Sequence, residues 1–329
     1  MTRIATRPRP LAALLFLACA VLAATYPARG ADYPTRPVRI VVPYPAGGPT
    51  DLIARLAAQT LAQSLGQEFF VENVSGASGV RGALMVAAAP ADGHTLMVAT
   101  SDFAIAPVLS SKVGYDPLGN FVPISIISRS PSVLLLHPSV PATSIQQFAA
   151  LARADPAKYS YAAMSQGHNL LSSERLFRLS LKLPIIRIPF PGAAPIVSST
   201  AAGHTLVGYI GLPPAAPLIK QGTLRALAIT SSQRSSIVPE VPTMAESGLA
   251  GQESELVIGL VAPARTPPSI VDRLAREIAL FVGAPQTQER LAALGFTTAA
   301  STPAEFAAQI KSDMDRAAEV IREVGIKIE

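Results

Sequence analysis

Short runs of β-branched and aliphatic residues alternate with longer amphipathic stretches along the chain after residue 31. The runs predict strands over residues 38–42, 69–73, 95–99, 122–127, 133–137, 159–163, 185–189, 206–210, 224–230 and 256–262. The stretches between them predict helices over residues 51–65, 80–88, 144–154, 170–180, 194–203, 215–221, 269–283, 286–294 and 303–324. This alternation favours an α/β protein with parallel strands. The two runs within 121–137 predict strands that cross between lobes, and the run 256–262 predicts a return to the first lobe.

The first thirty residues have the pattern of an export signal. Three arginines precede an uncharged apolar run over residues 11–24, and small residues flank the position before residue 31. A run of about 14 residues is too short to cross a bilayer as a helix. We therefore expect a signal peptide over residues 1–30, cleaved near Gly30, and a periplasmic mature protein. An uncleaved membrane anchor and lipidation at Cys19 are the alternatives.

Charge and cysteine content remove several classes of function. The pI near 9.5 favours a nucleic-acid partner at first sight. Four of the 27 basic residues lie in the leader, however, which leaves 23 basic against 22 acidic residues in the mature chain. Binding to nucleic acid therefore loses its support. The single cysteine also lies in the leader, so the mature protein has no disulfide and no cysteine nucleophile or metal ligand.

Three loops share one design, because each follows a predicted strand, is rich in small residues and opens a helix. They are residues 43–51, 74–79 and 164–169. The unpaired N–H groups of a first helical turn, together with the helix dipole, favour an anion. Ligands of open α/β sheets bind at the carboxyl ends of strands, so we expect these loops to converge on one site. An ordinary strand–helix turn is the alternative for each loop taken alone.

The loop 43–51 carries the strongest signal for an anion. Two prolines stiffen it, Gly47 and Gly48 leave its backbone accessible, and Thr50 adds a hydroxyl. Asp51 lies where it can cap the helix or favour its N-terminus. A nucleotide is disfavoured, because the loop lacks both the G-x-G-x-x-G spacing and a P-loop lysine.

Motifs for catalysis and metal binding are missing from the sequence. The four histidines have no metal-ligand spacing, and no G-x-S-x-G elbow occurs. We therefore expect no catalytic residue, no metal and no cofactor. His94 lies in a turn before a strand, where a structural role is expected. His168 lies in a candidate loop and is suited to donate a hydrogen bond to a carboxylate. An exported hydrolase remains an alternative, with Ser165 and His168 as the available nucleophile and base.

Ordered motifs along the mature chain resemble those of one receptor family. The sequence Val-Val-Pro-Tyr-Pro-Ala-Gly-Gly-Pro-Thr-Asp occupies residues 41–51, and further matches lie at 71–73, 91–96, 115–118, 189–195, 222–228 and 241–248. Together they resemble the Bug solute receptors, the extracytoplasmic binding proteins of tripartite tricarboxylate transporters. The resemblance covers essentially the whole mature chain.

The resemblance implies a type II periplasmic-binding-protein fold, with two α/β lobes and a ligand cleft between them. Lobe 1 would comprise residues 31–131 plus 254–329, and lobe 2 residues 132–253, with hinges near 128–133 and 250–256. It also implies that a monomer captures a small organic acid by hinge closure and presents it to the membrane permease subunits. A periplasmic sensor that serves a signalling receptor is an alternative that the sequence leaves open.

The ligand-binding residues that the resemblance implies come from both lobes. In lobe 1 they are Tyr44, Pro45, Ala46, Gly47, Gly48, Thr50, Asp51, Ser75, Ala77, Ser78, Thr100 and Ser101. In lobe 2 they are Ser165, Gln166, Gly167, His168 and Ile210.

Departures from the family's pattern bear on the ligand. Ile210 stands where the family often has an aspartate, and Val257-Ile258 replace an aromatic pair. The loop 164–169 is one residue shorter than usual. The first two changes make the far end of the pocket more apolar. We therefore expect a ligand with one well-held carboxylate and an apolar or weakly polar tail.

Overall fold

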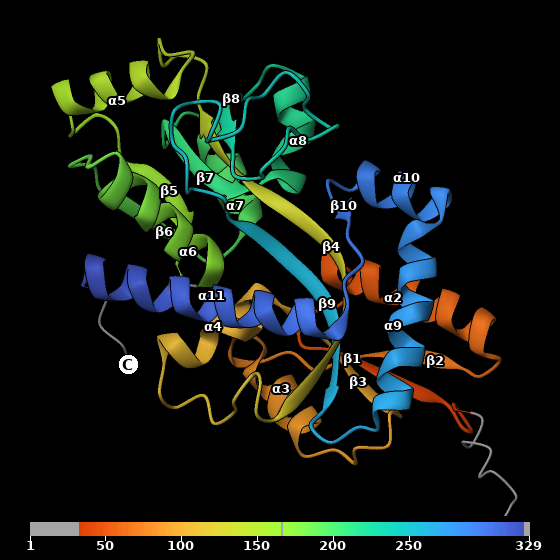
Figure 1. The fold of residues 1–329 in the computed structure, drawn as a ribbon. Coiled ribbons are helices and arrows are strands. Elements are labelled where there is room, and N and C mark those ends of the chain that lie inside the picture. The colour runs from red at the N-terminus through yellow and green to blue at the C-terminus, as the bar shows by residue number, and fades with distance from the viewer. Residues whose placement is uncertain (1–32, 166, 326–329) are drawn as a thin grey trace, which may run out of the picture.

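The structure is a computed structural model that describes residues 33–165 and 167–325. The expected signal peptide, Cys19 and the predicted ligand residue Gln166 lie outside these ranges. The predicted α/β class is confirmed, since helices cover both faces of a strongly curled sheet (Figure 1). None of the helices in the described ranges is long and apolar enough to cross a membrane.

The first half of the molecule is built on parallel strands, as the alternation predicted. These strands pair in the order β2-β1-β3. The elements are β1 (Val38–Val42), α2 (Pro49–Leu65), β2 (Phe69–Asn73), α3 (Val80–Ala87), β3 (Thr95–Thr100), α4 (Ser101–Leu109), α9 (Pro268–Gly283), α10 (Pro285–Ala293) and α11 (Pro303–Val324). Helices α2 and α9 pack one apolar cluster on the sheet, while α3, α4 and α11 pack another on its opposite face.

The second half repeats this plan with a second set of parallel strands. They pair in the order β7-β5-β6, and β8 lies beside them along the long strand β4. The elements are α5 (Ile145–Ala154), β5 (Tyr161–Met164), α6 (Gly167–Glu174), a π-helical segment (Arg175–Ser180), β6 (Arg187–Phe190), α7 (Ala193–Ala201), β7 (Val207–Gly211), α8 (Leu212–Lys220) and β8 (Arg225–Ile229). Two further apolar clusters fill the faces of this sheet.

Two antiparallel strands, β4 (Phe121–Leu136) and β9 (Glu255–Pro263), connect the halves. The sequence predicted two strands within 121–137, but β4 is one continuous strand. Its polar centre stays paired because the strand changes partners there: Pro131 faces Glu255 of β9, and Ser132 faces Gly211 of β7. A short strand, β10 (Thr297–Thr298), also pairs with β4 and was not predicted.

Two helix boundaries differ from the prediction in ways that affect the site. Helix α4 begins at Ser101, where the sequence predicted only the end of a strand. Helix α6 begins at Gly167, so His168 lies in the first helical turn and not in a loop. A fifth apolar cluster joins α4, α6 and α11, which brings residues of both halves into contact.

Candidate ligand-binding site

Helices α2, α3, α4, α6, α7 and α8 each follow the carboxyl end of a parallel strand, the edge at which ligands of open α/β sheets bind. In all of these except α6, the side chain of the N-cap residue makes no capping hydrogen bond in the part of the chain that the structure describes. By contrast, Ser144 caps α5 and Thr302 forms a capping box on α11. Uncapped amides with an aligned helix dipole can accept an anion.

The loop before α2 is held in shape by Asp51. Its carboxylate accepts the N–H of Gly47 at 3.0 Å, Asn73 Nδ2 at 2.9 Å and Arg55 Nε at 3.0 Å. Burial raises the pKa of Asp51, but these hydrogen bonds outweigh it and leave the pKa below its usual value. Asp51 therefore supports the loop from inside and does not cap α2, for which no side-chain cap exists.

The three predicted segments of the first half do come together. The hydroxyls of Tyr44 and Thr100 share a hydrogen bond of 2.7 Å, and Asn73 Nδ2 donates to the carbonyl of Tyr44. A Cβ on Gly79 would lie within 3.6 Å of Tyr44 and of Pro43. We call the surface formed by residues 44–51, 75–79 and Thr100 the cradle.

Backbone conformation makes the cradle accessible. Gly47 has φ +83°, and a Cβ built on it would meet no atom within 4 Å, so the space in front of it is open. Ala77 and Ser78 also have positive φ, at 47° and 55°. Such left-handed residues are costly, and they concentrate at ligand sites.

Ser101 and Ile210, both predicted to bind ligand, are buried in other contacts. The hydroxyl of Ser101 accepts the N–H of Val257 at 3.1 Å and donates to the carbonyl of Glu255 at 3.3 Å. It therefore ties α4 to β9. Ile210 is 3% exposed and packs in the second-half core with Ile196.

The two halves meet at the N-termini of α4 and α6. Asp102 Oδ1 accepts the backbone N–H of His168 at 2.7 Å, across 66 residues of sequence. Gly167 has φ +82°, and a Cβ there would lie 2.6 Å from the same oxygen. The carboxylate of one half thus caps a helix of the other, so this end of α6 is already occupied by an anion of the chain itself. We call this contact the interlobe cap.

The ring of His168 contacts a residue other than Asp102. Its Nε2 pairs with Ser254 Oγ at 3.2 Å, and burial lowers its pKa. Ser165, the nucleophile of the hydrolase alternative, is exposed, and its N–H bonds to the carbonyl of Phe190. No hydrogen bond joins Ser165 and His168 among the described residues, and His168 Nε2 pairs with Ser254 instead.

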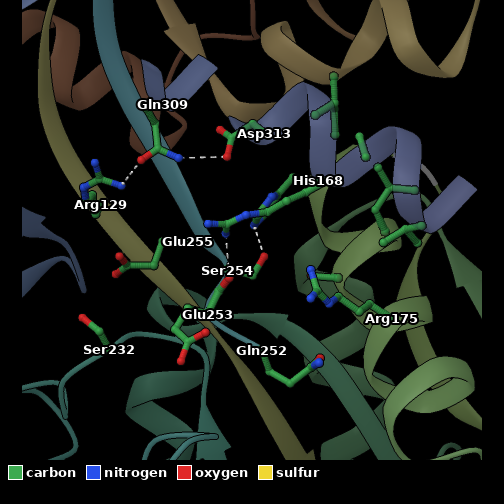
Figure 2. A pocket seen from close by; sticks show the side chains of 16 residues that line it. Arg129, His168, Arg175, Ser232, Gln252, Glu253, Ser254, Glu255, Gln309 and Asp313 are labelled. Carbon is green, nitrogen blue, oxygen red and sulfur yellow. Dashed lines mark hydrogen bonds between the residues drawn. The ribbon is translucent and has the colours of Figure 1, made fainter. Parts of the chain in front are cut away.

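A cavity of about 180 Å³ lies beside His168, between α4, α6, α11 and the start of β9 (Figure 2). Among the predicted site residues that the structure describes, only His168 lines it. Sequence analysis missed its polar residues, which include Arg129, Glu255 and Asp313. They come from three distant segments, so no local pattern connects them.

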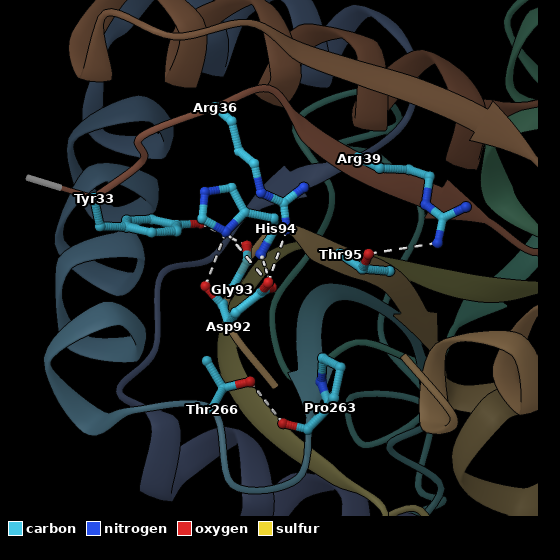
Figure 3. Close-up of polar contacts among 9 residues, drawn as sticks. All are labelled: Tyr33, Arg36, Arg39, Asp92, Gly93, His94, Thr95, Pro263 and Thr266. Atoms are coloured by element: carbon cyan, nitrogen blue, oxygen red, sulfur yellow. Dashed lines mark hydrogen bonds and ion pairs between the residues drawn. The ribbon is translucent and has the colours of Figure 1, made fainter. Parts of the chain in front are cut away.

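His94 has the structural setting that its turn suggested (Figure 3). Its N–H donates to Asp92 Oδ1 at 3.0 Å, Arg36 pairs with the same carboxylate group at 2.8 Å, and its ring packs edge-on against Tyr33. Among the residues that the structure describes, no group of three or more His, Cys, Asp or Glu is placed to hold a metal ion.

Known proteins resemble this chain along most of its length. The family model described as "Tripartite tricarboxylate transporter family receptor" matches residues 53–326. The protein BugT of Bordetella pertussis is 35% identical over 316 residues, which is 95% of this chain and 96% of BugT.

Solved structures resemble the chain in three dimensions. An R. palustris protein solved with adipate has a TM-score of 0.78 at 33% identity, covering 89% of this chain and 98% of that one. MatC from Rhodopseudomonas palustris, with bound malate, has a TM-score of 0.74 at 31% identity, covering 88% of this chain and all of MatC (100%).

Proposed function

The chain belongs to the tripartite tricarboxylate transporter receptor family, and from this premise we propose that it captures a small carboxylate in the periplasm and presents it to membrane permease subunits. Its fold is the type II periplasmic-binding-protein fold that the family resemblance implied. Two related structures contain the carboxylates adipate and malate. We also propose that membrane permease subunits receive the ligand and that the leader is cleaved.

The cradle is the observation that carries this proposal. The N-terminus of α2 has no side-chain cap, open space lies in front of Gly47, and Asp51 is already engaged by Arg55, Asn73 and Gly47. A ligand carboxylate would accept hydrogen bonds from backbone amides at the start of α2. Charge-assisted bonds of this kind are stronger than neutral ones.

The second half supplies little charge for the rest of the ligand. Residues 188–219, which include the N-termini of α7 and α8, contain no Asp, Glu, Lys or Arg. An unpaired second charge would be costly to desolvate against such a surface. We therefore infer a ligand with one carboxylate on the cradle and an apolar or weakly polar tail directed at α7 and α8.

Capture would proceed by closure of the two lobes, divided as the sequence suggested near residues 131 and 254. Strand β4 changes partners between Pro131 and Ser132, which supports a hinge at that position. The interlobe cap between Asp102 and His168 would form on closure and break on opening. Such domain closure about a few strand-terminal residues is a common way to enclose a ligand.

Calorimetry on the mature protein tests the cradle with a panel of aliphatic, aromatic and acidic carboxylates. Gly47→Val places a β-branched residue at φ +83° and fills the open space, so we expect binding of the preferred acid to weaken at least about tenfold. Gly283→Ala is the matched control, because nothing lies within 4 Å of its Cβ and its φ is ordinary. Unchanged affinity in Gly47→Val would show that the cradle is wrongly placed.

The same panel tests the ligand class. Native mass spectrometry of freshly purified protein should identify a co-purified monocarboxylic acid. If aspartate or glutamate outcompeted every aliphatic and aromatic acid, the inferred apolar tail would be refuted, even if the cradle held.

A further inference from the structure

The cavity beside His168 is separate from the cradle. None of the residues 44–51, 75–79 or Thr100 lines it. Its walls come from both halves of the molecule: α4 and α11 from the first, α6 from the second, and the segment 252–255 that leads into β9. It therefore lies on the α11 side of the interlobe contact.

The charged side chains of this cavity are its unusual feature. Three arginines and three acids line it: Arg129, Arg175, Arg316, Glu253, Glu255 and Asp313. None of the six takes part in an ion pair found among the described residues. Five of these side chains are half-buried and Arg316 is exposed, and charges of both signs thus face one space without an opposite charge in contact. Burial of an unpaired charge is costly.

Neutral groups take the place of ion-pair partners in the cavity (Figure 2). Arg129 donates to Gln309 Oε1 at 3.1 Å, and Gln309 Nε2 donates to Asp313 at 2.9 Å. Arg316 donates to the backbone carbonyl of Glu253 at 3.0 Å. Burial raises the pKa of the Glu255 and Asp313 carboxyls above the usual values, and it outweighs the opposing effect of nearby cations, Arg129 for Glu255 and His168 and Arg316 for Asp313.

We propose that this cavity is a second ligand site, which takes a small zwitterion with an ammonium and a carboxylate. The ammonium pairs with Glu255 and Asp313, and the carboxylate pairs with Arg175, at the start of the π-helical segment that follows α6, and with Arg316 of α11. The ligand therefore bridges the two halves. The site shares no residue with the carboxylate cradle proposed above.

Size and lining narrow the zwitterion to an aliphatic α-amino acid. Ile105, Leu171 and Val320 form an apolar part of the wall, which suits a short hydrocarbon side chain. A cavity of 150 Å³ can hold benzene, so one of about 180 Å³ holds roughly six to eight non-hydrogen atoms. Alanine, valine and proline have this size.

Binding is tested by calorimetry on the mature protein with alanine, valine and proline. Analogues that lack one charge, isobutyrate and isobutylamine, are compared with valine. We expect at least one amino acid to bind saturably, and each single-charge analogue to bind at least about tenfold more weakly. No binding of the three amino acids up to about 10 mM would overturn the proposal.

Variants locate the bound amino acid. Asp313→Asn and Arg316→Gln should each weaken it at least about tenfold. Glu319→Gln removes a charge from an exposed position of the same helix and should leave binding unchanged. Gly47→Val, which disables the cradle, should also leave it unchanged. Loss of amino-acid binding in Gly47→Val would place the amino acid in the cradle and refute a second site, whereas the carboxylate panel tests the cradle itself.

Stability of the empty protein gives a second readout. An acid whose pKa is raised by folding lowers stability as pH rises from its unfolded-state pKa, near 4, through its folded-state pKa. Glu255→Gln and Asp313→Asn should therefore raise Tm at pH 7.5, with the difference vanishing below about pH 4. If both variants lowered Tm at pH 7.5, the two acids would already be satisfied within the fold, and the proposed ammonium site would be wrong.

Discussion

The interlobe cap makes a sharp prediction about closure, because a carboxylate of the first half completes a helix of the second. Asp102→Ala removes the acceptor of the His168 N–H, and no other acceptor for that group is recorded in the described residues. The closed state would lose this bond, while the open state, in which both groups meet water, would lose nothing. The substitution should therefore shift the lobes toward opening.

The size of the shift follows from the value of a helix cap. Removal of an N-cap side chain costs about 0.5–2 kcal/mol, and a difference of 1–2 kcal/mol changes an equilibrium about 5–30-fold. We expect the ratio of open to closed ligand-free protein to increase by about 2–30-fold. Carboxylate affinity should fall by up to the same factor, because the closed state that holds the ligand would be less populated.

Distances between spin labels can measure the shift directly. The chain's one cysteine is Cys19, in the predicted leader. A mature protein with Arg276→Cys on α9 and Lys220→Cys on α8 therefore carries only the two labels. Both positions are exposed, and they lie in different halves. Asp102→Asn is the matched control, because it keeps an acceptor oxygen of the same size and should keep most of the closed state.

A double-mutant cycle tests the geometry of the same contact. In a protein that keeps Asp102, Gly167→Ala should shift the two lobes toward the open state, because the added Cβ would approach Asp102 Oδ1 to 2.6 Å. In Asp102→Ala that oxygen is gone, so Gly167→Ala should add only the strain of a positive φ, about 1–2 kcal/mol. Additive effects, or an unchanged label distance in Asp102→Ala, would refute the cap as a latch.

Two further predictions concern stability. Glu174 is 5% exposed, lies 2.9 Å from Arg187 and accepts a hydrogen bond from Tyr161. Because Arg187 is partly exposed, Glu174→Ala should lower the free energy of unfolding by about 1–3 kcal/mol in denaturant titrations. The folded-state pKa of Asp51 is lowered. Ionised Asp51 therefore contributes to the stability of the fold above its unfolded-state pKa, and this stabilisation is lost as pH falls through the folded-state pKa. Asp51→Asn should therefore lower the free energy of unfolding by about 1.5–3 kcal/mol at pH 7 and progressively less below about pH 4, measured by thermal unfolding. An equal loss of stability at pH 7 and below pH 4 would contradict this reasoning.

Local signals explain which parts of the fold the sequence predicted. The βα units were found because β-branched runs, prolines and glycines mark strand ends and helix starts within a few residues. Helix α4 was missed because residues 101–109 are apolar on most sides and include Pro107, which hides any helical period. The start of α6 was misplaced because its first turn is capped by Asp102, 66 residues away.

In the candidate site, too, the residues governed by local signals were predictable and those governed by long-range contacts were not. The cradle loop was predictable because glycine and proline act on their own backbone. Ser101 was expected at the ligand, yet its hydroxyl bonds to β9, a strand that begins 154 residues later in the chain. On α11, Gln309, Asp313 and Arg316 follow a helical spacing that is also typical of an ordinary solvent-facing surface. Only the packing of α11 against β4, α4 and α6 turns that face inward.

Helix α6 connects the two proposed sites through a single residue. The N–H of His168 bonds to Asp102 at the interlobe cap, while its ring reaches Ser254 on the cavity wall. An amino acid that bridges Arg175 and Arg316 would hold α6, through the π-helical segment that follows it, against α11. This is the arrangement in which the cap is formed. It should then favour the closed state that also binds the carboxylate. Linkage requires the effect to be mutual, so the acid must strengthen amino-acid binding by the same factor.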